Sequence, residues 1–195
     1  PPEHRAMLRQ CPPALLVAEA AFVDDCTQAK VVPAGTRCVA LARAPADGWT
    51  SWSDLLAAPP GALPQGDRNP RAPLLLCFTS GSTGEPKGVV LEHRHLSALV
   101  ASFAESYSPG PGDAILPLTS VASASFVGEI LPLLATGGTV VLPAKEEMLG
   151  AASILELVAR EGVTLLSTVP SLLALLNAAA EELPRLRLVL SGGEA

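Results

Sequence analysis

The segment from Thr79 to Gly88 combines groups that could bind an anion. It holds three glycines, four hydroxyl side chains and one lysine, in the order Thr79-Ser80-Gly81-Ser82-Thr83-Gly84-Glu85-Pro86-Lys87-Gly88. Glycine lets backbone N–H groups turn toward an anion, and successive amides can form a concave anion site. Hydroxyls and an ammonium add charge-assisted contacts of roughly 1.5–3 kcal/mol each where water is excluded. The segment therefore predicts a site for the phosphates of a nucleotide.

Apolar runs at 74–78 and 89–91 predict one strand before this segment and another after it. The spacing is not that of a Walker A loop, because Pro86 occupies the place of the second glycine. A strand rather than a helix follows, so a phosphate site built on a helix dipole is not indicated. The alternative is an ordinary hairpin loop, which rarely needs four hydroxyls and a lysine together.

Composition excludes several classes of protein. The 195 residues carry a net charge of −6, and 49% of them are hydrophobic, which is ample for a core. No basic patch with interleaved aromatics is present, so nucleic acid is not an expected partner. No apolar run approaches the ~18 residues of a membrane span, and the first residues do not resemble a secretory signal.

The four cysteines, Cys11, Cys26, Cys38 and Cys77, have neither zinc-site nor disulfide-framework spacing. We expect free thiols in a reducing compartment, and hence a cytoplasmic protein. His93 and His95 would diverge by ~200° on a helix, so a metal site there is not expected.

Helices and short apolar strands alternate after residue 88. Helices are predicted over 92–106, 123–134, 151–160 and 170–181, and strands over 114–116, 139–142, 163–166 and 186–190. This alternation predicts an α/β fold with a mostly parallel sheet and flanking helices, whose ligands bind at the carboxyl ends of the strands.

The first third of the chain is less strongly patterned. A helix is predicted over 3–10 and strands over 14–17 and 37–41, followed by a stretch rich in Pro, Gly and Ala at 57–73. We expect a partial first subdomain at 1–73 and a βα-rich subdomain at 74–195.

Residues 78–89 resemble the phosphate-loop signature of the adenylate-forming superfamily, which contains acyl-CoA synthetases, luciferases and the adenylation domains of nonribosomal peptide synthetases. Other segments resemble the superfamily in the same order, namely Pro2–Leu8, Glu92–Arg94, Val163–Leu173 and Leu188–Ala195. The resemblance thins between Cys26 and Pro73. It implies an inner part of the large N-terminal core of such an enzyme.

The resemblance implies a reaction in which a carboxylate attacks the α-phosphate of ATP, giving an acyl-adenylate and pyrophosphate, with Mg²⁺ as cofactor. In such a reaction the protein mainly positions groups and stabilises charge. The phosphates would be held by Thr79, Ser80, Gly81, Ser82, Thr83, Gly84 and Lys87. The residues next to the adenine and the substrate would be Ser191, Gly192, Gly193 and Glu194.

Several segments of the superfamily have no counterpart in these 195 residues. They include the glutamate that helps to hold Mg²⁺, the ribose-binding aspartate and the lysine of the C-terminal lid. We therefore expect the metal ligand to lie elsewhere and the chain to need the rest of an adenylation domain. No catalytic residue is assigned, and the 195 residues alone are expected to be inactive. A carboxylic or amino acid and a carrier protein are the expected partners.

The resemblance also implies an acyl pocket. Glu129-Ile130 sets the register, and Ala124 then occupies the place of the aspartate that pairs with a substrate amino group. An alanine leaves a buried ammonium uncompensated, so an α-amino acid is disfavoured against a hydroxy, keto, β-amino, aryl or aliphatic acid. Further small wall positions are Ser125, Gly128, Ser167, Val189 and Ser191. The alternative is that these are close-packing positions of a helix on a sheet.

Three functions follow for the whole protein. The first is an adenylation domain of a nonribosomal peptide synthetase, the second an acyl- or aryl-CoA ligase, and the third a non-catalytic remnant that serves as a structural or interaction module. Glu129 could act as a general acid or base. A single glutamate on a helix is more often solvated or a helix cap, and we expect that role here.

Overall fold

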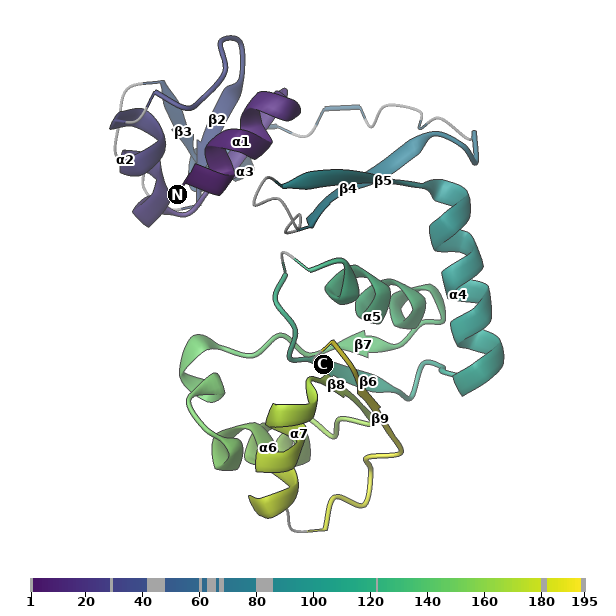
Figure 1. Cartoon of the computed structure of the whole chain (residues 1–195). Helices are drawn as coiled ribbons and strands as arrows, with labels where there is room; N and C mark the ends of the chain where they lie inside the picture. The colour runs from purple at the N-terminus through teal and green to yellow at the C-terminus, as the bar shows by residue number, and fades with distance from the viewer. Residues whose placement is uncertain are drawn as a thin grey trace. The chain divides into compact units, whose positions relative to one another are not determined.

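Figure 1 shows the chain as a computed structural model. The structure describes residues 2–28, 30–41, 48–59, 61–62, 66, 69–79, 86–121, 123–179 and 182–193. The chain divides into two compact units, one formed by residues 1–68 and 78–89 and the other by 69–77 and 90–195. The predicted division into 1–73 and 74–195 stays a prediction, and the segment 78–89 belongs to the first unit.

The first unit is built on a parallel sheet with the strand order β1-β2-β3. Its elements are α1 (Pro2–Gln10), β1 (Leu15–Ala18), α2 (Ala20–Gln28), β2 (Arg37–Ala40), β3 (Trp49–Ser51) and α3 (Trp52–Ala57). The predicted helix 3–10 and both predicted strands are present, whereas α2, β3 and α3 were not predicted. Ser51 starts α3, since its hydroxyl accepts a hydrogen bond from the Asp54 N–H at 3.1 Å.

The glycine-rich segment connects two paired strands, β4 (Pro73–Thr79) and β5 (Lys87–Glu92). The helix α4 (His93–Tyr107) follows β5 directly. Glu92 and His95 form a capping box at its start, with the Glu92 N–H donating to His95 Nδ1 at 3.2 Å. Ser108 ends the helix in a left-handed conformation.

The second unit contains a four-stranded parallel sheet in the order β7-β6-β8-β9. The strands are β6 (Ala114–Pro117), β7 (Thr139–Val140), β8 (Leu165–Thr168) and β9 (Leu188–Ser191). The helices are α4, α5 (Ala124–Ala135), α6 (Ala151–Arg160) and α7 (Pro170–Ala179), with a short 3₁₀ turn, η1 (Lys145–Met148). The predicted α/β class is therefore confirmed, with its parallel strands divided between two sheets.

Helices cover both faces of this sheet (Figure 1). On one face, Ile115 and Leu165 are fully buried in a cluster with Phe103 of α4 and Leu133 of α5. On the other face, Leu116 and Leu166 pack in a cluster with residues of α6 and α7. Because neighbouring residues of a strand point to opposite faces, a strand covered on both faces needs consecutive apolar residues, as at Ile115-Leu116 and Leu165-Leu166.

The helix α5 contains a proline, Pro132, in its interior. Proline has no N–H, so the carbonyl of Gly128, four residues earlier, lacks its usual partner within the helix. The helix ends at Thr136, whose hydroxyl donates to the carbonyls of Pro132 at 3.2 Å and Leu133 at 2.9 Å. Gly137 then turns the chain into β7 with a φ of 85°, which favours glycine.

Candidate functional site

Thr79 and Lys87 lie at the two ends of the strand pair that carries the glycine-rich segment. Thr79 ends β4 and Lys87 begins β5, and the Thr79 hydroxyl donates to the Lys87 carbonyl at 3.5 Å. Both residues are exposed. The predicted phosphate ligands Ser80, Gly81, Ser82, Thr83 and Gly84 lie outside the described residues. The structure thus positions the first and last members of the predicted set.

A side chain of α1 fixes the end of this segment. Pro86 is buried, and its carbonyl accepts a hydrogen bond from Gln10 Nε2 at 3.0 Å. Lys87 follows Pro86 immediately, and its side chain remains available to an anion near the start of β5. A lysine in this position can act as a point charge toward phosphate oxygens.

The carboxyl end of the four-stranded sheet carries a polar cluster around Glu129. The Glu129 side chain is only 6% exposed, and both of its oxygens accept from the Thr119 hydroxyl at 3.1 Å. Burial raises the pKa of Glu129, while hydrogen bonds from Ser167 and Thr119 oppose that rise. The expectation of a solvated or capping glutamate was therefore wrong, because this turn of α5 faces the sheet.

Thr168, at the end of β8, was not singled out from the sequence. It is 2% exposed, and its hydroxyl is the one buried side-chain oxygen or nitrogen among the described residues with no hydrogen-bond partner. A buried hydroxyl without a partner costs about 1–3 kcal/mol of stability. Such an atom at the carboxyl end of a parallel strand is suited to a ligand. Only its orientation, which the sequence does not give, distinguishes it from other strand threonines.

The predicted acyl-pocket residues do not all lie on one face of the sheet. In the register of β8 and β9, Ser167 pairs with Leu190 and Thr168 pairs with Ser191. Ser167 therefore faces α5, on the side where Leu188 and Leu190 pack. Val189 and Ser191 alternate with these leucines and point to the opposite face. The pleat thus separates Val189 and Ser191 from Ser167, and it brings Leu190, which the sequence analysis missed, to the α5 side.

The remaining predicted pocket residues belong to α5. Ala124 is its first residue, Ser125 is exposed, and Gly128 faces α4. A Cβ atom at Gly128 would meet Leu99 Cδ2 at 3.5 Å, an ordinary contact. Beside it lies an apolar cavity of about 150 Å³. Its lining comes from β4, β5, α4 and α5 and consists of Leu74, Leu75, Leu91, His95, Leu96, Leu99 and Val127.

The end of β9 leads into the predicted substrate-proximal residues. Ser191 is exposed, and the N–H of Gly192 donates to the Thr168 carbonyl at 3.3 Å. Gly193 has a φ of 93°, which allows a turn away from the sheet. Glu194 lies outside the described residues. The structure thus brings Ser191 and Gly192 next to Thr168, at the carboxyl end of the sheet.

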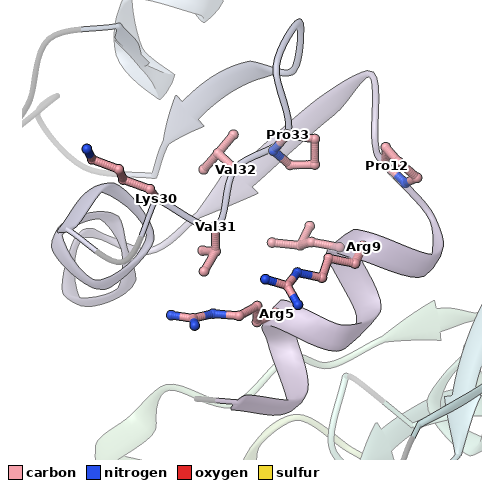
Figure 2. Close-up of a pocket in the computed structure, with 8 residues that line it drawn as sticks. Arg5, Arg9, Pro12, Lys30, Val31, Val32 and Pro33 are labelled. Atoms are coloured by element: carbon pink, nitrogen blue, oxygen red, sulfur yellow. The ribbon is translucent and has the colours of Figure 1, made fainter.

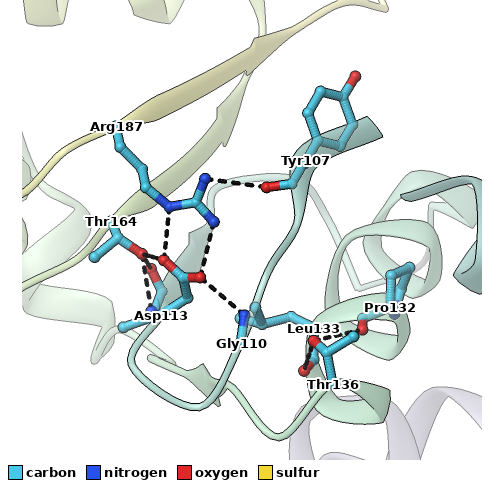
Figure 3. Close-up of polar contacts among 9 residues, drawn as sticks. Tyr107, Gly110, Asp113, Pro132, Leu133, Thr136, Thr164 and Arg187 are labelled. Atoms are coloured by element: carbon cyan, nitrogen blue, oxygen red, sulfur yellow. Dashed lines mark hydrogen bonds and ion pairs between the residues drawn. The ribbon is translucent and has the colours of Figure 1, made fainter. Parts of the chain in front are cut away.

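The amino end of the same sheet carries a different polar cluster, centred on Asp113 (Figure 3). Its carboxylate accepts from Arg187 Nε and Nη2, both at 2.8 Å, from the Thr164 hydroxyl at 2.6 Å and from the Gly110 N–H at 2.9 Å. Arg187 also donates to the Tyr107 carbonyl at 3.1 Å. The hydrogen bonds from Arg187, above all, hold the pKa of Asp113 well below its usual range. This cluster joins the starts of β6, β8 and β9, and both oxygens of the Asp113 carboxylate accept hydrogen bonds within it.

Metal binding and membrane insertion find no support in the described part of the chain. There, His, Cys, Asp and Glu side chains form no group of three or more that could hold a metal ion. The helices of the same residues are too short or too polar to cross a bilayer. Cys11, Cys26, Cys38 and Cys77 are free thiols.

Comparison with known proteins identifies the family. The sequence model of the family described as AMP-binding enzyme matches residues 1–195, so the chain belongs to that family. The chain is 33% identical over 199 residues to the indoleacetate–CoA ligase of Aromatoleum aromaticum, covering 98% of this chain and 38% of that protein. It is 38% identical over 121 residues to gramicidin S synthase 2 of Brevibacillus brevis, covering 61% of this chain and 3% of that protein.

A solved structure shows the same fold. The crystal structure of an anthranilate CoA ligase in complex with anthranoyl-AMP is similar with a TM-score of 0.84 and 22% sequence identity. The match covers 100% of this chain and 39% of that chain. The chain therefore spans less than half the length of each of these three proteins.

Proposed function

As a member of the AMP-binding enzyme family, this chain is, we propose, the phosphate-binding and acid-binding part of an enzyme that activates a carboxylic acid with ATP. The carboxylate oxygen attacks the α-phosphate, an acyl-adenylate forms and pyrophosphate leaves. The single observation that carries the proposal is that Thr79 and Lys87 flank a segment with two glycines and three further hydroxyl side chains. ATP would supply the leaving group and Mg²⁺ would neutralise phosphate charge, with the metal ligands outside these 195 residues.

The residues of this chain would bind and orient. Lys87 and the hydroxyls from Thr79 to Thr83 would hold the β- and γ-phosphates, and the Lys87 ammonium would stabilise the charge that grows on pyrophosphate. Thr168 would gain a hydrogen-bond partner when a ligand occupies the carboxyl end of the sheet. The Glu129 cluster would hold α5 in place, and with it the α5 side of the apolar cavity beside Gly128 that would receive the acid.

We propose an aryl or aliphatic acid, rather than an α-amino acid, as the substrate class. Ala124 brings no carboxylate that could pair with an ammonium group, and the cavity next to Gly128 is lined by apolar side chains together with His95. A buried ammonium without a counter-charge is costly, whereas an apolar acid gains from the same surroundings.

The acceptor of the activated acid distinguishes two candidate enzymes. An acyl- or aryl-CoA ligase is favoured by the relative from Aromatoleum aromaticum, which matches 98% of this chain. An adenylation domain serving a carrier protein is favoured by the higher identity, 38%, of the segment shared with gramicidin S synthase 2. The non-catalytic remnant is the third candidate, opposed by the intact glycine-rich segment. We further propose that the 195 residues alone do not complete the reaction.

The test is ATP–pyrophosphate exchange by the longest natural protein that carries these residues, with a panel of aryl, aliphatic and α-amino acids. We expect exchange with an aryl or aliphatic acid. Lys87→Ala should reduce it by roughly 10- to 100-fold, the loss expected for one charge-assisted contact. Arg71→Ala, which removes an exposed cation outside the segment, is the control and should leave the rate unchanged. Exchange that is equal in both variants, or absent with every acid, would contradict the proposal.

A further inference from the structure

The first unit contains a cationic cavity that the proposed function does not use. It has a volume of about 360 Å³ and lies between α1 and the loop that enters β2 (Figure 2). Arg5, Leu8 and Arg9 line it from α1, and Lys30, Val31 and Val32 line it from the loop. The two guanidinium groups extend toward Val31, while Lys30 lies on the other side of that loop. The cavity therefore has a cationic wall and an apolar floor.

The sequence explains why the two arginines share this wall. Residues three and four apart lie on the same face of a helix, so Arg5, Leu8 and Arg9 face the loop together. Leu8 is partly buried, whereas both arginines are exposed. The apolar residue thus anchors α1 and leaves the two guanidinium groups at the mouth of the cavity.

Hydrogen bonds next to the cavity join the segments that follow its two walls. The Thr36 hydroxyl donates to the Pro13 carbonyl at 2.8 Å, and the Arg37 N–H donates to the Ala14 carbonyl at 3.0 Å. On the loop side, the Val31 N–H donates to the Cys26 carbonyl at 3.3 Å. The loop and the entry to β1 are thereby tied together, so the cationic groups are presented from a fixed frame. A preformed site loses less conformational freedom when a ligand binds.

The cations of this cavity have no acidic partner in the described structure. The ion pairs found among the described side chains involve Arg94, Arg160 and Arg187. None of the residues that line the cavity is acidic. In a chain with a net charge of −6, two arginines and a lysine around one cavity are therefore free to attract an anion from solution.

The cavity lies away from the carboxyl ends of the strands in its sheet. Pro12 and Pro33 line it and precede β1 and β2, so it lies at the amino ends of these strands. The ligands of the proposed reaction are expected at the carboxyl ends of strands and at the glycine-rich segment.

We propose that this cavity is a second anion site, which takes a phosphorylated small molecule. A planar guanidinium group can donate two parallel hydrogen bonds to phosphate oxygens, and two guanidinium groups can bind the same phosphate group. Leu8, Val31 and Val32 offer an apolar floor to the organic part of the ligand. The volume suits a small molecule rather than a protein segment.

The test uses NMR of the Arg Nε–Hε groups in the full 195-residue chain, titrated with inorganic pyrophosphate. We expect saturable shifts of the Arg5 and Arg9 signals. The double substitution Arg5→Gln/Arg9→Gln should weaken pyrophosphate binding at this site about tenfold or more. In this variant, which lacks both arginine signals, the backbone amide signals of Val31 and Val32 report the binding. Arg37→Gln, which removes an exposed cation from the same unit outside the cavity, is the matched control and should change the affinity less than twofold.

A second arm separates this site from the glycine-rich segment. In a Lys87→Gln background the Arg5 and Arg9 signals should still shift with unchanged affinity, and loss of that response would overturn a separate site. Citrate, an anion with carboxylates only, tests the ligand class: tighter binding of citrate than of pyrophosphate would overturn the phosphate assignment. Equal pyrophosphate binding by the double variant and the Arg37→Gln control would overturn the site itself. Each of these results is independent of whether the protein activates a carboxylic acid.

Discussion

The two ends of the four-stranded sheet in the second unit differ in how fully their polar side chains are hydrogen-bonded. At the amino end, Asp113 is paired with Arg187 and accepts further hydrogen bonds from Thr164 and Gly110. At the carboxyl end, the Thr168 hydroxyl is buried with no partner among the residues that the structure describes, and burial raises the pKa of Glu129. One end is complete without a ligand and contributes stability, whereas the other carries costs that a ligand can offset.

The largest expected effect lies at the complete end. Asp113→Ala should lower the free energy of unfolding by about 3 kcal/mol, because Thr164, Gly110 and Arg187 lose their shared acceptor. We place the loss near this value because the Arg187 side chain is 41% exposed and water screens its attraction to Asp113. Urea unfolding followed by circular dichroism measures it. The rate of ATP–pyrophosphate exchange with the carboxylic acid substrate, counted per folded molecule, should stay unchanged. A loss of this exchange in folded Asp113→Ala protein would contradict a purely structural role for the amino end of the sheet.

The two carboxylates should give pH dependences of opposite sign. The pKa of Asp113 is lowered on folding, so its contribution to stability is present above about pH 4 and is lost as the pH falls below that value. The pKa of Glu129 is raised on folding, so its ionisation costs stability as the pH rises above about 4.3.

Two amide substitutions isolate these contributions. The stability advantage of the wild type over Asp113→Asn should shrink on acidification below about pH 4. Its stability relative to Glu129→Gln should fall as the pH rises above about 4.3. Unfolding free energies measured from pH 3 to 8 test this, and slopes of the same sign would contradict it.

At the incomplete end, Thr168→Val should stabilise the ligand-free protein by about 1 kcal/mol, because a methyl group replaces a buried hydroxyl that has no partner. The same change should raise the KM for the acid or for ATP, since the hydroxyl is proposed to bind a ligand. Thr164→Val is the matched control at the other end and should destabilise the protein instead. If Thr168→Val destabilised the protein to a similar extent, its hydroxyl would be satisfied in solution and the contrast would fail.

The smallest expected effect concerns Gly128. Gly128→Ala should stabilise α5 by up to about 1 kcal/mol, because the new methyl group meets Leu99 at an ordinary contact distance and alanine favours a helix. If the adjacent cavity receives the acid, Gly128→Ala should also make ATP–pyrophosphate exchange faster with narrower acids relative to wider ones. Thermal unfolding and the acid panel measure the two effects, and an unchanged acid preference would place the substrate elsewhere.

Local sequence pattern predicted most of the second unit but only part of the first. The helices α4 to α7 and the strands β6, β8 and β9 follow apolar periodicity, with boundaries that differ by a few residues. The elements β3 and α3 escaped prediction because they are short and lie next to Pro, Gly and Ala, where tertiary contacts rather than periodicity decide the structure. The helix α2 was also missed, because its nine residues mix apolar and polar side chains without a clear helical period.

The site shows the same limit at the level of single side chains. Thr79 and Lys87 were proposed as phosphate ligands from composition and spacing, because an anion site needs such groups close together in the chain. The raised pKa of Glu129 and the unsatisfied hydroxyl of Thr168 both result from burial, which depends on packing between elements. The separation of Val189 from Ser167 comes from the pleat and the register of two strands, which no run of residues specifies by itself.

The proline within α5 has a consequence for how broad a range of acids the protein can accept. Pro132 leaves the carbonyl of Gly128 outside the helical ladder, at the residue that has no side chain to stiffen the turn. Helices bend most readily at such places. A small change in the curvature of α5 there would alter the width of the neighbouring cavity without any substitution. One sequence could then bind several related acids.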